Sequence, residues 1–299
     1  MTSLSPDKRR ARKHERPPAG AKPLQLKSIV WLASYPKSGN TWTRIFLANY
    51  LLNTREPVPI NQVHRIGLGD SISGAYWLAG GRRYDADDYL GHLRMRDRVL
   101  RGFVSNGATM NFVKTHNARW KVLGTDLIPA SYTRAAIYVL RNPLDVVVSY
   151  ARHYGITTTE TVQRLSRADN GIAGDAKNVQ QYLGDWSGHV LSWADCRDFP
   201  VLVMRFEDMK QSPEASFTRL LDFLGVPLEA ERLERAVRFS SFDEMRRQES
   251  ATPFVERSPN AERFFHSGET GQWKDALSAE DAGSLRSRHA DVMARFGYL

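Results

Sequence analysis

The sequence predicts an α/β fold, a single domain in which a central parallel sheet is flanked by helices. Four short apolar runs, rich in β-branched and aromatic residues, alternate with helical patterns, and each run ends at a cluster of polar residues. Buried strands of a parallel sheet look like this where they lead into an active-site edge. No internal repeat or linker interrupts residues 28–299, so we expect one domain over that range.

The elements follow in order along the chain. Strands are expected at Ser28–Ala33, Asn111–Val113, Ala136–Leu140 and Val201–Met204. A loop, Ser34–Asn40, precedes a largely apolar helix, Thr41–Leu52. Further on, Ser212 is expected to cap a helix that begins at Pro213 and stops at Gly225. Ser278–Asp281 resembles a capping box that opens the last helix.

Two stretches, Arg55–Ala108 and Gly155–Gly184, show no clear periodicity. Long irregular segments of compact enzymes are often lids or binding loops, and ordinary surface insertion is the alternative. If they are binding loops, we expect them to build a pocket for a small acceptor.

Charge is concentrated at the start of the chain. Residues 1–27 hold eight lysines and arginines against two acidic residues, so they carry +6 of the net charge of +9. Such a basic, proline-rich tail with few aromatic residues is expected to be disordered. A nucleic-acid or membrane-surface arm is the alternative, but the nearly neutral remainder is not expected to bind nucleic acid.

Other classes are disfavoured by what the composition lacks. The sequence has no apolar run of membrane-spanning length and no secretory signal, which predicts a cytoplasmic protein without membrane contact. The single cysteine, Cys196, can form neither an internal disulfide nor a multi-thiolate zinc site. No carboxylate cluster has metal-ligand spacing, so we expect no metal. The sequence does not indicate an oligomeric state.

An anion-binding loop is predicted between the first strand and the first helix, at Tyr35–Trp42. Successive backbone amides and the positive end of a helix form a cradle for an anion there. Gly39 permits close approach, Lys37 adds a positive charge, and Ser38, Asn40 and Thr41 can donate hydrogen bonds. The loop lacks the glycine and lysine order of a Walker A motif, which argues against a kinase-type diphosphate site.

Two further strand ends carry polar residues with chemical potential. The third predicted strand runs into Arg141, a planar fork of donors for a phosphate, and Ser149 lies one or two helical turns into the next helix. In the alternative reading, Arg141 pairs with Asp145 at the surface. The second strand leads into Lys114 and His116, and a histidine has the near-neutral pKa that suits a general base.

These strings resemble the motifs of sulfotransferases that use 3′-phosphoadenosine 5′-phosphosulfate (PAPS), over about residues 28–275. The resemblance implies a P-loop-kinase-like fold and PAPS as the donor. Tyr-Pro-Lys-Ser-Gly-Asn-Thr-Trp is similar to the family's 5′-phosphosulfate loop. It implies that Lys37 holds the bridging oxygen, that Ser38, Gly39, Asn40 and Thr41 surround the 5′-phosphate, and that Trp42 stacks on adenine.

The resemblance also gives roles to the other strand ends. Arg141 and Ser149 match the residues that bind the 3′-phosphate, and Lys114-Thr115-His116 matches the segment with the catalytic histidine. The implied catalytic set is therefore His116, Lys37, Lys114 and Ser149, with His116 as general base for in-line transfer to a phenol or alcohol.

The third cofactor motif departs from the family pattern. His266-Ser267-Gly268, preceded by Phe265, stands where the family usually has Arg-Lys-Gly, so two positive charges are missing from the 3′-phosphate site, and Phe265 to Gly268 are the expected cofactor contacts here. Gly271, Trp273 and Lys274 do match. Ser240 and Phe242 resemble the segment that contacts adenine. We expect weaker or re-routed cofactor contacts; a small-molecule kinase and a nucleotide-binding protein without catalysis are the alternatives.

Overall fold

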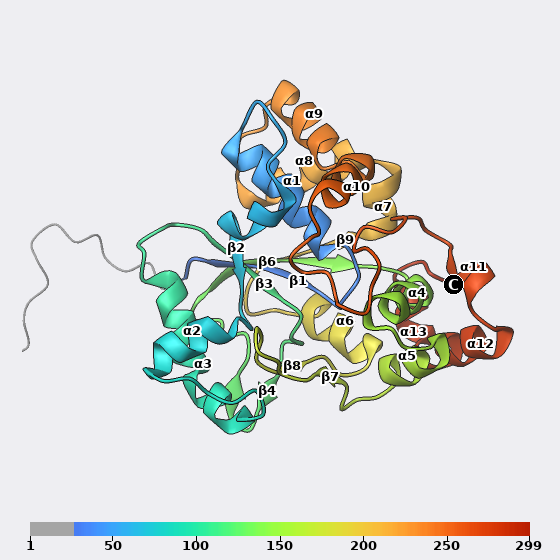
Figure 1. Ribbon diagram of the computed structural model, residues 1–299, viewed down its shortest axis with the longest axis horizontal. Coiled ribbons are helices and arrows are strands. Elements are labelled where there is room, and N and C mark those ends of the chain that lie inside the picture. The colour runs from blue at the N-terminus through green and yellow to red at the C-terminus, as the bar shows by residue number, and fades with distance from the viewer. Residues whose placement is uncertain (1–26) are drawn as a thin grey trace, which may run out of the picture.

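The computed structural model describes residues 27–299, so the prediction of a disordered basic tail falls, except for Lys27, outside the described residues. Five parallel strands form the central sheet in the order β2-β3-β1-β6-β9 (Figure 1). Their bounds are β1 (Ile29–Ser34), β2 (Gly67–Gly69), β3 (Asn111–Thr115), β6 (Thr133–Leu140) and β9 (Val201–Arg205). Two small antiparallel pairs lie outside it: β4 (Lys121–Val122) with β5 (Thr125–Asp126), and β7 (Gly171–Ile172) with β8 (Gln181–Tyr182).

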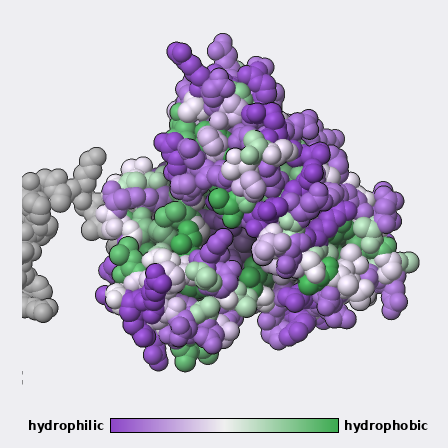
Figure 2. Space-filling model, in the orientation of Figure 1, coloured by the Kyte–Doolittle hydropathy of each residue, from purple (hydrophilic) through white to green (hydrophobic). Residues whose placement is uncertain are grey.

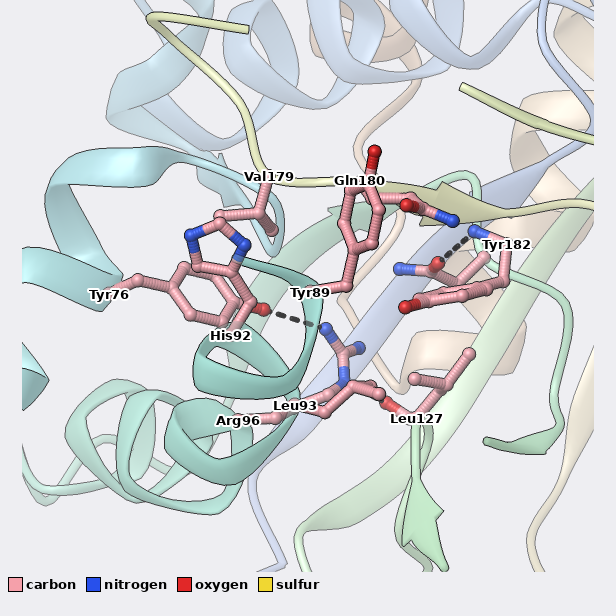
Figure 3. Close-up of a pocket in the computed structure, with 10 residues that line it drawn as sticks. Tyr76, Tyr89, His92, Leu93, Arg96, Leu127, Val179, Gln180 and Tyr182 are labelled. Atoms are coloured by element: carbon pink, nitrogen blue, oxygen red, sulfur yellow. Dashed lines mark hydrogen bonds between the residues drawn. The ribbon is translucent and has the colours of Figure 1, made fainter. Parts of the chain in front are cut away.

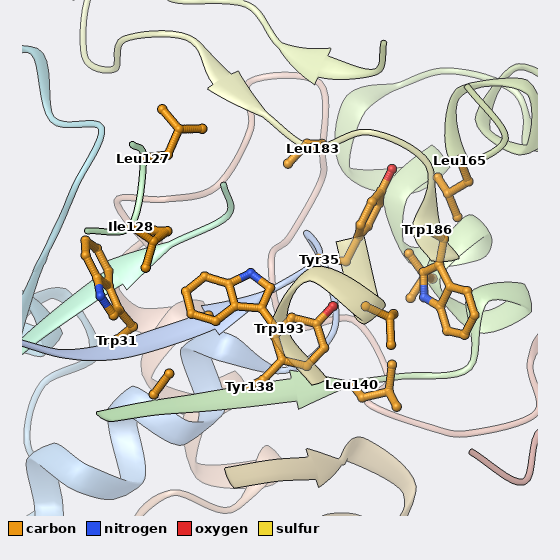
Figure 4. Packing of buried hydrophobic residues seen from close by; sticks show 14 of the residues in the cluster. Trp31, Tyr35, Leu127, Ile128, Tyr138, Leu140, Leu165, Leu183, Trp186 and Trp193 are labelled. Atoms are coloured by element: carbon orange, nitrogen blue, oxygen red, sulfur yellow. The ribbon is translucent and has the colours of Figure 1, made fainter. Parts of the chain in front are cut away.

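The central strand β1 is buried on both faces. Its residues alternate between two cores: Ile29, Trp31 and Ala33 belong to one, and Val30 and Leu32 to the other. Figure 4 shows the first core, where Trp31 and Trp193 lie beside the sheet. A strand that is covered by helices on both sides needs a continuous apolar sequence, which explains the run that the sequence shows.

Helices cover the two faces of the sheet (Figure 1). On one face lie α1 (Asn40–Leu52), α7 (Phe206–Gln211), α8 (Pro213–Leu224), α9 (Ala230–Phe239) and α10 (Phe242–Ala251). On the other lie α3 (Tyr89–Val104), α4 (Pro143–Tyr154), α5 (Thr158–Leu165), α6 (Trp186–Ala194), α12 (Ala279–Arg288) and α13 (Ala290–Arg295). The short α11 (Trp273–Ala276) contacts α4, and α2 (Ser73–Gly80) packs on α3.

The predicted fold class is confirmed, and the four expected strands are present with slightly different ends. Helix α8 begins at Pro213 and ends before Gly225 as expected, but Ser212 makes no side-chain capping bond. Its backbone, with φ −141° and ψ 72°, holds the hydroxyl away from the helix amides. At α12 the Ser278 side chain does accept from the amide of Asp281.

The stretch Arg55–Ala108 is more regular than its sequence indicates. It holds a 3₁₀ helix, η1 (Ile60–Arg65), the edge strand β2 and the helices α2 and α3. The sixteen-residue α3 is amphipathic, but its many arginines hide the apolar stripe. The surface in Figure 2 is mostly hydrophilic, and apolar side chains gather on the side of α2 and α3, where Leu78 and Leu90 are exposed.

Candidate active site

Three loops that carry the predicted site residues meet at one edge of the sheet. β1 lies between β3 and β6, and all three strands run in the same direction. The loops that follow their carboxyl ends therefore open on the same side, which brings the Lys37, His116 and Arg141 regions together. Each strand is fixed by backbone pairing, so the loops start from a rigid frame.

The loop after β1 has an unusual backbone. Gly39 has φ 110°, and Lys37, although not a glycine, has φ 68°. A left-handed conformation costs an ordinary residue about 1–2 kcal/mol. Such strain persists only where the surrounding structure enforces it, and it accompanies functional loops. Helix α1 starts directly afterwards, so its first amides point into the space that the loop encloses.

We expect Gly39→Ala to destabilise the fold by roughly 2–3 kcal/mol and to abolish nucleotide binding. A Cβ at this position would lie 2.8 Å from the Phe206 ring, in addition to the strain of the positive φ. Urea denaturation and nucleotide titration would measure the two effects. Gly225→Ala is the matched control, because Gly225 also has a positive φ but its added Cβ meets nothing within 4 Å. Equal losses in the two variants would contradict a special role for the loop.

The polar side chains of the loop are arranged unequally. Ser38 is buried, and its hydroxyl has no hydrogen-bond partner among the described residues. Asn40 donates from Nδ2 to the carbonyl of Leu32 at 2.8 Å, so its side chain fastens the loop to β1 instead of pointing outward. Its backbone amide and that of Thr41 remain available, because the first helical bond runs from Thr43 to Gly39.

Trp42 is 9% exposed and packs edge-to-face on Phe206 and Phe217, with ring centroids 5.7 and 5.6 Å away. It belongs to the core that covers the α1 face of the sheet. Its indole Nε1 is buried without a partner. The residue is thus a core aromatic in this structure, and the stacking role implied by the family stays a prediction.

The ammonium of Lys37 lies over the ring of Phe264, 3.9 Å from its centroid. Burial, followed by the nearby Arg141 and Lys114, lowers the pKa of Lys37 to about 7. Bringing an anion into the loop would favour the charged form of this lysine. Crowded cations of this kind are the expected surroundings of a site that binds an anionic group.

His116 follows β3, and Ser34 fixes its orientation; the Ser34 hydroxyl lies 3.3 Å from Nδ1. Nδ1 lies 2.9 Å from the carbonyl oxygen of Ser34. A carbonyl can only accept, so Nδ1 carries the proton and Nε2 keeps its lone pair. Burial, and then the charge of Lys114, hold the pKa of His116 well below its usual value. The imidazole is therefore neutral near pH 7, which is the state that a general base requires.

A buried histidine supports the His116 loop from behind. His189 of α6 donates from Nε2 to the carbonyl oxygen of His116 at 3.0 Å and accepts from the hydroxyl of Tyr138 at Nδ1, 2.9 Å away. Burial lowers the pKa of His189 to about 4, so it stays neutral. Its ring also packs edge-to-face on Tyr35 of the anion loop. One side chain thus connects two of the three loops.

Arg141 joins the anion loop to the C-terminal part of the chain. It is 5% exposed and donates from Nη1 to the carbonyl of Lys37 at 3.1 Å and from Nη2 to the carbonyl of Glu269 at 2.9 Å. Its Nε has no partner among the described residues, and its guanidinium covers the ring of Phe206. The alternative reading of a surface pair with Asp145 is wrong. The carboxylate of Asp145 instead accepts from the amides of Gly271 and Trp273.

The connecting segment, residues 252–272, joins α10 to α11 and lies over this edge of the sheet. Phe265 is buried, and Phe242 packs edge-to-face on it. An added Cβ at Gly268 would lie 2.3 Å from the Phe242 ring, so these predicted cofactor residues are brought together. Ser267 accepts from the amide of Glu269, and His266 is exposed.

The positions of the last two predicted site residues, Ser149 and Ser240, do not indicate what they bind. Ser149 is half-buried on α4. Ser240 is fully buried, and its hydroxyl donates to the carbonyls of Ala236 and Val237 at the end of α9. The contact of Ser240 with adenine that the family resemblance implies stays a prediction.

A small cavity of about 10 Å³, room for about one water molecule, lies beside the His116 loop (Figure 3). Residues of both unassigned stretches line it: Tyr76, Tyr89, His92, Leu93, Arg96, Val179, Gln180 and Tyr182, with Asn117 and Leu127. Arg96 forms a buried ion pair with Asp70 at 2.7 Å. The Asp70 carboxylate also accepts a hydrogen bond from the Asn117 side chain. The lining is therefore aromatic with a fixed polar edge.

Sequence reasoning missed one group of charged residues. Glu256 of the connecting segment pairs with Arg44 at 2.8 Å and with Lys114 at 3.3 Å. Arg44 was the available signal, because it interrupts an otherwise apolar helix, and a buried arginine requires a partner. The partner lies 212 residues away in sequence, in a region without periodicity, and no pattern indicated it.

Residues 27–299 lack two features, a membrane-spanning helix and a cluster of metal ligands. None of the helices there is long and apolar enough to span a membrane. Within the same residues no group of three or more histidine, cysteine or acidic side chains could hold a metal ion. The expectation that the reaction needs no metal stays a prediction.

Comparison with known proteins now identifies the family. The sulfotransferase domain matches residues 27–297, nearly the whole chain. The chain belongs to this family. Sulfotransferase 1A1 of Rattus norvegicus is 29% identical over 164 residues, 52% of this chain and 55% of its own length. Sulfotransferase 1 family member D1 of Mus musculus is 26% identical over 272 residues, 83% of this chain and 78% of its own. The match to the rat sulfotransferase thus spans just over half of that protein.

Solved sulfotransferase-type structures share the fold. Mouse sulfotransferase SULT7A1, complexed with PAP, superposes with a TM-score of 0.58 at 19% identity, covering 90% of this chain and 84% of that one. Retinol dehydratase in complex with androsterone and the inactive cofactor PAP gives a TM-score of 0.63 at 20% identity, covering 91% and 82%. At these identities the likeness establishes the sulfotransferase fold, with its P-loop-kinase-like sheet.

Proposed function

We propose that this sulfotransferase moves a sulfuryl group from PAPS to the hydroxyl of a small phenol or alcohol. One observation carries the proposal: the anion loop, the neutral His116 and the buried Arg141 follow three adjacent strands of one sheet. Family membership supports the donor class, and two of the solved structures that share the fold are complexes with PAP.

In this proposal the anion loop holds the phosphosulfate. The amides at the start of α1 and the free hydroxyl of Ser38 face the 5′-phosphate, and Lys37 contacts the bridging oxygen. Phe242, Phe265 and Gly268 form the wall on the nucleoside side. The Nε of Arg141, unpaired among the described residues, is the donor left for a phosphate.

The transfer step is a displacement at sulfur. The acceptor oxygen attacks the sulfur while the bond from sulfur to the bridging oxygen breaks, and the nucleotide leaves as 3′-phosphoadenosine 5′-phosphate. Nε2 of His116 takes the hydroxyl proton, because Nδ1 is already committed to Ser34. Lys37 and Lys114 stabilise the charge on the leaving side and on the transferring group.

The charge missing from the family's Arg-Lys pair is replaced, we propose, by arginines around His266. Burial, and then Arg152 and Arg263, lower the pKa of His266, which shows that these cations lie near it. Arg152 is on α4, one turn beyond Ser149, and it donates to Gln272 of the connecting segment at 2.8 Å. Arg246 and Arg263 line an adjacent open cavity of about 130 Å³, together with Arg257, Glu249 and Glu262. The 3′-phosphate is expected on this side.

The acceptor is expected to enter from the side of the small cavity. Its tyrosines suit a phenol ring or another apolar alcohol, and the ion pair of Arg96 with Asp70 keeps its polar edge rigid. At about 10 Å³ the cavity holds about one water molecule, so it has to widen to admit such an acceptor. Asn117, next to His116 in the chain, lines this cavity, so an acceptor bound there lies close to the base.

The first test is calorimetric titration with 3′-phosphoadenosine 5′-phosphate beside ATP with Mg²⁺. We expect micromolar binding of the bisphosphate and none of ATP. The opposite result would place the protein among small-molecule kinases and overturn the proposal. Bisphosphate binding without any sulfuryl transfer over a panel of phenols and alcohols would point instead to a nucleotide-binding protein that lacks catalysis.

A further inference from the structure

Glu256 stands out because it brings a negative charge into a site built from cations. Its carboxylate receives two hydrogen bonds from Nη1 of Arg44, at 2.8 and 3.1 Å, and one from Nζ of Lys114 at 3.3 Å. Arg44 is 2% exposed and lies on α1, two residues beyond Trp42. The carboxylate thus bridges a helix that begins at the anion loop and the strand that leads to His116.

The other carboxylate near these lysines is already committed. Glu249 of α10 is buried, and its two oxygens accept from the backbone amides of Phe264 and Phe265. It holds the connecting segment in place. Glu256, in contrast, accepts hydrogen bonds from cationic side chains alone among the described residues, which is the behaviour of a counter-ion.

We propose that Glu256 is a positioning residue that fixes Lys114 beside His116 and balances the positive charge that Lys37 shares with Lys114. The buried Arg44 holds the carboxylate in place, so the balance does not depend on a mobile surface group. The proposal deepens the sulfotransferase function and rests on it for its kinetic consequence, while its electrostatic content can be tested separately.

The groups around Lys37 determine the sign of the effect. Arg141 at the end of β6 and Lys114 on β3 oppose its charge, whereas Glu256 and Glu249 favour it. His153 of α4 also lies near Lys37, and its pKa is lowered to about 3, chiefly by burial, so it is neutral. Removing Glu256 therefore leaves Lys37 among cations, and its pKa must fall.

The test is acetylation of Lys37 across a pH series, quantified by mass spectrometry, because only the neutral amine reacts. In the wild-type protein we expect a midpoint near pH 7, given the pKa of about 7. In Glu256→Gln the midpoint should move to lower pH by roughly 1 unit. Glu262→Gln is the matched control: its side chain lies in the same segment but is 85% exposed, and among the cations of residues 27–299 it pairs with Arg263 alone. It should leave the midpoint unchanged.

Glu256→Gln also leaves Arg44 buried without a charge partner, which is destabilising by itself. The double variant Arg44→Met with Glu256→Gln removes that charge while Lys114 still lacks its partner. If the midpoint stays shifted in the double variant, Glu256 acts as the counter-ion. If the double variant returns to the wild-type midpoint, or neither variant shifts, the proposal is wrong.

Kinetics separate this proposal from the proposed function. In the pH profile of kcat/KM for PAPS, the fall on the alkaline side should begin at lower pH in Glu256→Gln than in the wild type. Glu256→Asp should reverse part of this shift. Absence of any sulfuryl transfer by the wild-type protein would defeat the function, whereas the acetylation midpoints would still decide the role of Glu256.

Discussion

Replacing His116 by alanine is expected to lower turnover by roughly 10²–10⁴-fold, the range that loss of a general base usually produces. Nε2 is the only atom of the ring free to take a proton, because Nδ1 donates to the Ser34 carbonyl. Cofactor affinity should be nearly unchanged, since the anion loop and Arg141 do not depend on the imidazole. Steady-state kinetics and calorimetry with 3′-phosphoadenosine 5′-phosphate measure the two quantities.

Asn is the informative control at this position, because His116→Asn keeps a donor for the Ser34 carbonyl without a basic lone pair. Both variants should be equally slow if proton transfer is the role. A parallel loss of nucleotide affinity in both would instead indicate that His116 holds the loop. The pH profile adds a check: burial lowers the pKa of His116, so turnover should persist on the acid side of pH 6.5 before the imidazole is protonated.

Replacing Arg141 by alanine is expected to weaken binding of 3′-phosphoadenosine 5′-phosphate by roughly 100-fold. Hydrogen bonds to a charged group contribute about 1.5–3 kcal/mol each, and the change also removes the bridge between the carbonyls of Lys37 and Glu269. Calorimetry measures the affinity. Thermal denaturation measures how much stability the bridge supplies.

Adenosine 5′-phosphosulfate, which lacks the 3′-phosphate, distinguishes the two contributions. If Arg141 contacts the 3′-phosphate, Arg141→Ala should lose much more affinity for the bisphosphate than for this shorter nucleotide. Arg141→Lys, which retains charge without the planar fork, should lie between wild type and alanine. Equal losses for both nucleotides would limit Arg141 to joining the anion loop to the connecting segment.

The sheet and the three site loops could be predicted from the sequence because each depends on local patterns. A strand buried on both faces must be apolar throughout, and Ile29–Ser34 shows that directly. Polar residues follow each of the predicted strands, and the resemblance to sulfotransferase motifs selected Lys37, His116 and Arg141 among them. Parallel topology then places the loops at one edge.

What could not be predicted depends on contacts between distant residues. Glu256 meets Arg44 and Lys114 only after the connecting segment folds back over the sheet, and that segment has no periodicity to follow. The sequence predicts that the Asn40 side chain donates to a phosphate. In the structure its Nδ2 instead donates to the carbonyl of Leu32 in β1. Helix α3 was missed because arginines such as Arg96 occupy positions on its buried side, where a partner neutralises them.

The position of β1 in the sheet has a consequence for how the chain is assembled. This first strand pairs with β3, starting at Asn111, and with β6, starting at Thr133, so both neighbours come from much later in the sequence. During synthesis it has no strand partner until slightly more than a third of the chain has left the ribosome. The anion loop, which hangs from its end, therefore takes shape late, and the apolar strand must be kept from aggregating until then.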